Sequence, residues 1–208
     1  MELFPIIPII VSLQKWQRLT IGIRFFILFL VSEFLINCVS NYYLFVLHIS
    51  NLFLFYFYPF FQNIFILTTF WHFFKRRWEQ ILSICLIFLS NILIILDFTF
   101  ISKIGYNYLS NFGIDITITL ISFYYVYSYF PHNSFNKSLT NKTKLIISTT
   151  IVLQFFIKTI NIFVEKNLLE SQFNGFVISQ TRNIYAYFML FCLLLYTYAI
   201  NNVRKDEK

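Results

Sequence analysis

The stretch IVLQFFIKTINIF, residues 151–163, is an apolar run interrupted by one lysine, Lys158. The surrounding segment, Leu145–Val164, has about the 20 residues that an α-helix needs to cross the hydrocarbon core of a bilayer. A cation near the centre of such a helix costs about 2.5–3.5 kcal/mol on insertion scales. The sequence therefore predicts a membrane-spanning helix here, together with a group elsewhere in the bundle that compensates the charge of Lys158.

Five further apolar segments are long enough to span a bilayer: Ile21–Ser40, Tyr42–Phe70, Ile81–Ile101, Phe112–Phe130 and Ile184–Val203. The segment Leu3–Leu13 would reach only about 16 Å as a helix, and two prolines interrupt it. It is expected to be a half-buried first helix, a re-entrant piece or a shortened span. The fold class that follows is all-α: residues 1–208 form a single polytopic transmembrane helix bundle with six full spans and a short N-terminal apolar helix over residues 3–13, about seven helices in all.

The composition indicates that the membrane bundle makes up the whole chain, with no additional soluble domain. Hydrophobic residues make up 58% of the sequence and charged residues only 12%, whereas about 25% charge is usual for soluble domains. The three cysteines are isolated from one another, without the spacing of a metal site. With four glycines in the chain, a phosphate-binding loop is not expected. We expect membrane lipids as partners, no nucleic acid, no metal and no cofactor.

The positive charges indicate how the bundle is oriented. Twelve lysines and arginines lie in alternate connections and at the C-terminus, and only three lie in the other connections. The three tryptophans also fall beside the basic connections. The positive-inside rule places the basic connections in the cytoplasm. The N-terminus lacks the basic region and cleavage site of a signal peptide. We therefore predict a multi-pass protein of the bacterial inner (cell) membrane with a cytoplasmic C-terminus.

Five ionisable side chains from five predicted spans share the outer third of the membrane. Counted along their helices, these are Glu33, His48, Asp97, Asp115 and Lys158. Three asparagines extend the polar faces at helical spacing: Asn37 follows Glu33, Asn51 follows His48 and Asn161 follows Lys158. Exposing polar side chains to the hydrocarbon of the bilayer is energetically unfavourable. These eight residues are therefore the candidate ligand-binding or buried polar cluster, in a cleft open to the outside.

The partner of Lys158 is expected to be Glu33 or one of the two aspartates. Two further polar residues, Tyr58 and Gln62, share a face with His48, and Pro59 between them should kink that helix. For Lys158 and Glu33 the alternative is a buried ion pair that only locks two helices, and for His48 it is a hydrogen-bonded contact between helices. Asp97 and Asp115 could also lie at the interface and reach water.

The function favoured by this pattern is non-catalytic: binding, sensing or transport of a small polar or amphiphilic molecule that enters from the outer side. One alternative is an intramembrane lipid hydrolase, in which a histidine and carboxylates at one depth bind zinc and activate water. A single histidine makes poor zinc chemistry, and no hydrolase motif occurs. The other alternative is a structural or accessory membrane subunit. No catalytic residue is assigned.

The layout resembles a known group of membrane proteins. The stretches FPIIPIIVSLQKWQRLTIGIRFFILFLVSEFLIN, residues 4–37, and NYYLFVLHISNLFLF, residues 41–55, are followed by spans with short connections and a basic tail. This order is similar to that of a family of uncharacterised small seven-helix integral membrane proteins of Bacteroidetes, and the similarity covers nearly the full chain. The resemblance implies a seven-helix topology with a shortened first helix. It implies no activity.

Overall fold

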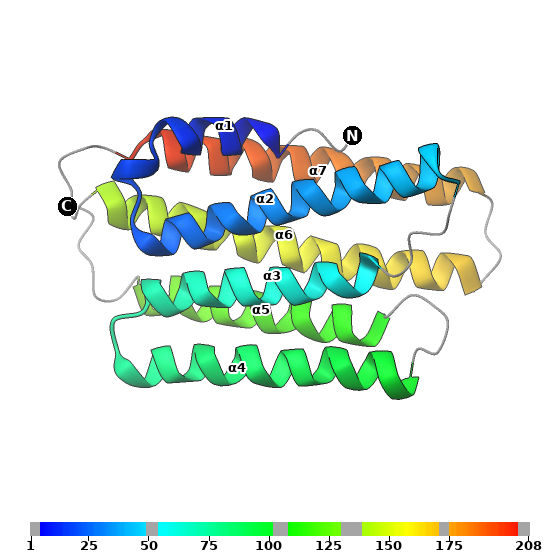
Figure 1. The fold of residues 1–208 in the computed structure, drawn as a ribbon, viewed down its shortest axis with the longest axis horizontal. Helices are drawn as coiled ribbons and strands as arrows, with labels where there is room; N and C mark the ends of the chain where they lie inside the picture. The colour runs from blue at the N-terminus through cyan, green and yellow to red at the C-terminus, as the bar shows by residue number, and fades with distance from the viewer. Residues whose placement is uncertain (1–4, 49–53, 102–107, 130–138, 171–174, 204–208) are drawn as a thin grey trace.

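The computed structural model describes residues 5–48, 54–101, 108–129, 139–170 and 175–203. All regular structure in these ranges is helical (Figure 1). The helices are α1 (Ile6–Gln14), α2 (Ile21–Asn41), α3 (Leu54–Phe73), α4 (Arg77–Leu96), α5 (Tyr108–Tyr129), α6 (Leu139–Glu170) and α7 (Gly175–Asn201). Three short helical segments accompany them: the 3₁₀-helix η1 (Trp16–Arg18) and the π-helical segments η2 (Tyr42–Val46) and η3 (Asp97–Ile101). The all-α prediction and the short N-terminal helix are confirmed.

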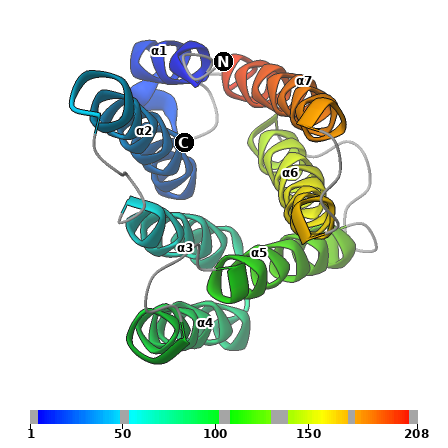
Figure 2. The ribbon, with the colours of Figure 1, turned by 90° about the vertical axis from the view of Figure 1, so that its right-hand side faces the viewer.

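Six of the helices form a ring when the bundle is viewed along its length (Figure 2). Going around it, α2 packs on α3, α3 on α5, α5 on α6, α6 on α7 and α7 on α1, and α1 contacts α2 to close the circle. The remaining helix, α4, lies outside this ring against α3 and α5. Residues that point into the ring can therefore meet from helices far apart in the sequence.

Four stretches within the described residues are long and apolar enough to cross a membrane: Ile21–Val46, Arg77–Phe100, Asn141–Val164 and Ser179–Asn201. These belong to α2, α4, α6 and α7. The chain therefore has the character of a membrane protein. The sequence predicted six spans, and for α3 and α5 that remains a prediction. Helices α6 and α7 also extend beyond their apolar runs, by residues that carry more polar side chains.

The boundary between the first two predicted spans is shifted. The sequence placed it at Asn41, between two apolar segments. In the structure the helix continues through η2, and the chain turns only near His48, which has a positive φ of 53°. No glycine or proline interrupts residues 41–46, so nothing in that stretch stops the helix. The second predicted span therefore begins later than expected, at Leu54.

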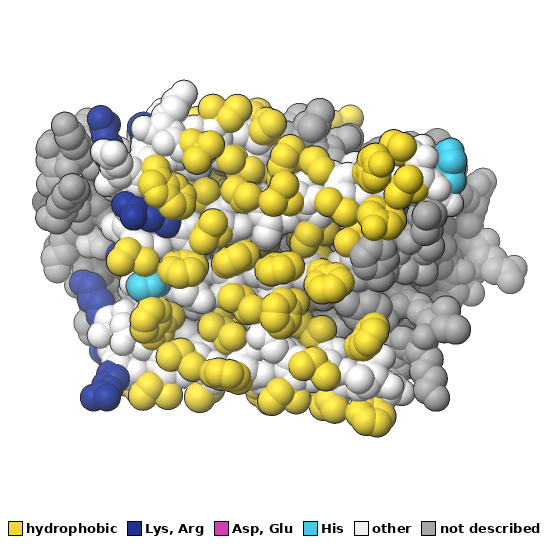
Figure 3. Space-filling view, in the orientation of Figure 1, with side chains coloured by type: hydrophobic (Ala, Val, Ile, Leu, Met, Phe, Trp, Pro, Cys, Tyr) yellow, Lys and Arg dark blue, Asp and Glu magenta, His cyan; other side chains and the backbone are white. Residues whose placement is uncertain are grey.

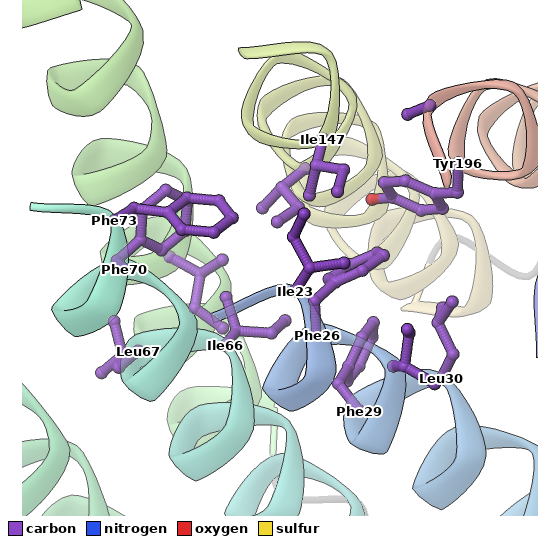
Figure 4. Packing of buried hydrophobic residues seen from close by; sticks show 14 of the residues in the cluster. Ile23, Phe26, Phe29, Leu30, Ile66, Leu67, Phe70, Phe73, Ile147 and Tyr196 are labelled. Atoms are coloured by element: carbon purple, nitrogen blue, oxygen red, sulfur yellow. The ribbon is translucent and has the colours of Figure 1, made fainter. Parts of the chain in front are cut away.

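A layer of large apolar side chains fills the interior of the ring toward the end of the bundle where α2 begins. Figure 4 shows how these side chains meet, with residues of α2, α3, α6 and α7 pointing toward one another. The largest include Phe26, Phe29, Phe70 and Tyr196, all fully buried. The rings of Phe26 and Tyr196 lie 4.6 Å apart between centroids. This layer closes the interior on that side.

The outer surface of the bundle matches a lipid environment. Apolar side chains cover the middle of the face seen in Figure 3, and lysines and arginines gather at its left-hand end. Many large hydrophobic residues on α2, α4 and α7 are exposed, including Leu35, Phe88 and Ile184. Exposed apolar surface on this scale would be costly in water and is expected in a bilayer.

Candidate functional site

Lys158 of α6 forms an ion pair with Asp115 of α5. The ammonium nitrogen lies 2.8 Å from Oδ1 of Asp115, and the two side chains are 13% and 0% exposed. Gln62 of α3 joins both groups: its Nε2 donates to Oδ1 of Asp115 at 2.8 Å, and its Oε1 accepts from Lys158 at 3.2 Å. The group that neutralises the charge of Lys158 is therefore Asp115, one of the three carboxylates that the sequence offered as partners.

Tyr58 of α3 connects this ion pair to Glu33 of α2. Its hydroxyl donates to Oε1 of Glu33 at 3.3 Å. The ammonium of Lys158 lies 4.9 Å from the centroid of the Tyr58 ring, within the range of a cation–π contact. Glu33 is 8% exposed. Glu33, Tyr58, Gln62, Asp115 and Lys158 are hereafter called the polar cluster. It joins four helices of the ring.

Two carboxylate oxygens of the polar cluster are buried without a donor. Oε2 of Glu33 and Oδ2 of Asp115 accept no hydrogen bond from any residue in the described ranges. A buried polar atom in this condition costs about 1–3 kcal/mol, and more when it carries charge. The polar cluster therefore has unused acceptor capacity as well as one more carboxylate than ammonium.

The polar cluster lies about one helical turn beyond the apolar layer on each helix. Phe29 precedes Glu33 on α2, Ile66 follows Gln62 on α3, and Phe155 precedes Lys158 on α6. Phe29 and Phe155 contact each other, with ring centroids 6.3 Å apart. The apolar layer thus separates the polar cluster from the end of the bundle that carries the basic connections.

The other predicted site residues lie around the polar cluster or away from it. Asn37 and Asn161 are partly buried, about one turn beyond Glu33 and Lys158. Asp97 is buried and accepts a hydrogen bond from the backbone N–H of Ser110 at 3.0 Å. Because Ser110 is in the first turn of α5, Asp97 stabilises the start of that helix instead of reaching water.

His48 does not join the polar cluster in the structure. It is exposed and lies just after η2, at the end of the bundle. The sequence placed it about seven residues deep because a span was expected to begin at residue 42, whereas the helical path of α2 extends past that residue. Asn51, the eighth predicted site residue, lies outside the described ranges.

Two members of the polar cluster, Tyr58 and Gln62, were absent from the predicted site. Their spacing on α3 identified a polar face, but sequence periodicity does not say which face of a helix meets which neighbour. A second buried polar contact joins two neighbouring helices of the ring, where the hydroxyl of Tyr196 donates to Oε1 of Gln154 at 2.6 Å. It connects α7 to α6.

The chain was compared with known proteins by family, by sequence and by structure. No protein-family model matches it, and no curated protein or solved structure is significantly similar to it. The assignment to the seven-helix family of Bacteroidetes therefore remains a prediction.

Proposed function

We propose that this protein binds a small molecule with hydrogen-bond donors, such as an amine, at the polar cluster and from the outer side of the membrane. The observation that carries the proposal is the pair of buried carboxylate oxygens without donors, Oε2 of Glu33 and Oδ2 of Asp115. A ligand that donates to them would satisfy both. Sensing and transport are uses of the same binding step.

The charge of the polar cluster supports a cationic or donor-rich ligand. With Glu33 and Asp115 ionised and Lys158 protonated, the cluster carries one negative charge in excess. Charge buried in a bundle is normally compensated. A ligand ammonium would supply the missing cation and the missing donors together, in the same way as Lys158 serves Asp115.

Access from the outer side is supported by the apolar layer. The layer separates the polar cluster from the basic end of the bundle, which the positive-inside rule assigns to the cytoplasm. The opposite end is the shorter route for a polar molecule. We further propose six spans, α2 to α7, in a bacterial inner membrane with a cytoplasmic C-terminus. If α2 and α4 both span and start at the same end, as Figure 1 shows them to start, the chain must recross the membrane through α3.

The accessory-subunit interpretation has one observation in its favour. The ion pair Lys158–Asp115 joins neighbouring helices, and such a pair can serve helix packing alone. The hydrolase alternative gains no comparable support. The described residues contain no group of three His, Cys, Asp or Glu side chains that could hold a metal ion, and His48 lies away from the carboxylates.

The test is ligand-induced thermal stabilisation of the detergent-purified full chain with methylammonium, ethanolamine and putrescine, and with acetate as an anionic control. Wild-type protein should be stabilised by at least one amine, by about 2.7 kcal/mol at a hundredfold excess over Kd. Glu33→Gln should lose this response, because the amide has one acceptor oxygen and no charge.

Glu79→Gln provides the matched control. Glu79 is also buried, at 5% exposure, and also accepts a hydrogen bond from a tyrosine, but it lies at the other end of the bundle. It should respond to amines as wild type does. If no amine stabilises wild-type protein, or if Glu33→Gln and Glu79→Gln lose the response equally, the proposal fails and a packing role for the charges is favoured.

A further inference from the structure

A cavity of about 300 Å³ opens near the basic end of the bundle. It lies between the connection from α3 to α4, the last turns of α5 and the first turns of α6. Pockets that hold small molecules have volumes of about 300–1,000 Å³, so this one is large enough for a small group. The residues that line it do not overlap with the polar cluster.

The charge around this cavity is positive. Lys75 and Arg76 contribute from the connection before α4, where both are exposed, and Lys144 contributes from α6. None of these three cations forms an ion pair with a side chain that the structure describes. Cations that converge on a concave surface raise the local concentration of anions.

One carboxylate, that of Glu79, also lines the cavity, and both of its oxygens are already hydrogen-bonded. Oε1 accepts from the hydroxyl of Tyr124 at 3.0 Å, and Oε2 accepts from the backbone N–H of Arg76 at 3.3 Å. The carboxylate therefore holds the start of α4 in place and leaves the three cations available. With three cations and one carboxylate, the lining of the cavity carries two positive charges in excess.

Aromatic rings form the wall of the cavity on the side of the bundle core. Phe73, Phe74 and Tyr125 line it and are buried. The ammonium of Lys144 lies 5.4 Å from the centroid of the Phe73 ring, which holds this cation against the wall by a cation–π contact. Basic pockets at the cytoplasmic end of membrane bundles bind anionic lipid head groups, and an apolar wall beside the cations suits such a ligand.

We propose that this cavity binds a phosphate group, carried either by an anionic phospholipid headgroup or by a small soluble phosphate compound. The phosphate oxygens accept charge-assisted hydrogen bonds from Lys144, Lys75 and Arg76, and a guanidinium can engage two of them at once. Asn141 of α6 also lines the cavity and supplies an uncharged donor. The proposal is independent of the amine site in the polar cluster.

The experiment measures phosphate binding to the full chain in two arms. In the first arm the protein is placed in phosphatidylcholine nanodiscs with and without phosphatidate, and retained lipid is measured by native mass spectrometry. In the second arm the detergent-solubilised protein is titrated with inorganic phosphate and with glycerol 3-phosphate, and the thermal unfolding midpoint is followed. Retention in the first arm alone identifies a lipid headgroup, and binding in the second identifies soluble phosphate.

Two variant pairs make each arm specific. Lys144→Met and Arg76→Gln remove cations that line the cavity. Lys142→Met removes an exposed cation of α6, and Arg77→Gln removes the exposed first residue of α4. Neither residue lines the cavity. Binding should weaken about tenfold in each lining variant and less than about twofold in each control. Arg76 is exposed, so Arg76→Gln is expected to fold even if Lys144→Met does not.

Two results would overturn the proposal. The first is an equal loss in lining and control variants, because general attraction of the basic end to anionic membranes would then explain all of the binding. The second is the absence of phosphate binding in both arms while the circular dichroism of wild-type protein shows an intact helical fold.

Discussion

Replacing Lys158 by methionine perturbs the ion pair at the centre of the bundle while keeping an unbranched side chain of similar length. Asp115 then keeps one donor, the Nε2 of Gln62 at 2.8 Å from Oδ1. Its Oδ2 already lacks a donor within the described ranges, and the carboxylate is 0% exposed. The substitution therefore leaves a buried charge that neither water nor a cation of the polar cluster compensates.

The expected loss of stability follows from this geometry. Two unit charges 2.8 Å apart attract each other by about 6 kcal/mol at an effective dielectric constant of about 20. The cost of desolvating both charges cancels much of this attraction in the wild type, so the net contribution of the pair to the free energy of unfolding is much smaller. Removing one partner of a buried pair costs about 3–5 kcal/mol, because the other charge stays buried alone. We expect Lys158→Met to lower the free energy of unfolding by this amount.

The assay is reversible unfolding in mixed micelles, with the free energy of unfolding measured for single and double variants. Lys158→Met combined with Asp115→Asn should recover most of the loss, because the double variant buries no unpaired charge at this position. Lys158→Met combined with Glu33→Gln should recover little, because Glu33 takes its hydrogen bond from Tyr58. Lys142→Met, at an exposed lysine of the same helix, should change stability by less than about 0.5 kcal/mol.

Two outcomes would refute this reasoning. If Lys158→Met is as stable as wild type, the ammonium faces water and Asp115 is not dependent on it. If the double variant with Glu33→Gln recovers stability and the one with Asp115→Asn does not, the partner of Lys158 is Glu33 and the arrangement of α5 and α6 described above is incorrect.

Two further predictions concern packing and hydrogen bonding. Gly22→Ala should destabilise the protein by about 1–3 kcal/mol, because a Cβ there would lie 2.9 Å from the Phe73 ring between α2 and α3. Gly113→Ala should be neutral or stabilising by up to about 1 kcal/mol, because nothing lies within 4 Å of the added Cβ and alanine favours the helix. The unfolding assay described above compares the two variants. Equal effects would contradict the close approach of α2 and α3 at Gly22. Tyr58→Phe should cost about 1–3 kcal/mol by removing the donor to Glu33. In the background of Glu33→Leu the same change should cost much less, and an unchanged cost would show that the hydroxyl serves another partner.

Much of the site could be predicted because polar residues are expensive in a membrane. Glu33, Asp115 and Lys158 each lie in a predicted span, and counting residues from the span ends placed all three in the outer third of the membrane, with Asp115 slightly shallower than the other two. The structure brings these three into one cluster with Tyr58 and Gln62. The prediction for His48 differed because its depth was counted from a boundary at residue 41, and the helix continues through Val46. Where neither proline nor glycine marks a turn, the end of the preceding helix is hard to predict from the sequence.

The choice among the possible partners of Lys158 was beyond the sequence. Periodicity places a side chain on a face of its own helix but says nothing about which neighbouring helix that face meets. The ring order, with α3 and α6 on either side of α5, brings Gln62 and Lys158 to Asp115. Glu33 meets Tyr58 instead, because α2 packs on α3.

The sequence by itself determined the all-helical class, the membrane character and the basic end of the bundle, because each of these follows from local hydropathy and charge. Only the tertiary structure decided which charge pairs with which, that α4 lies outside the ring, and that Lys75, Arg76 and Lys144 meet at one cavity. Those facts depend on the order and rotation of helices about one another. Both are set by side-chain packing between segments distant in sequence, which no local pattern encodes.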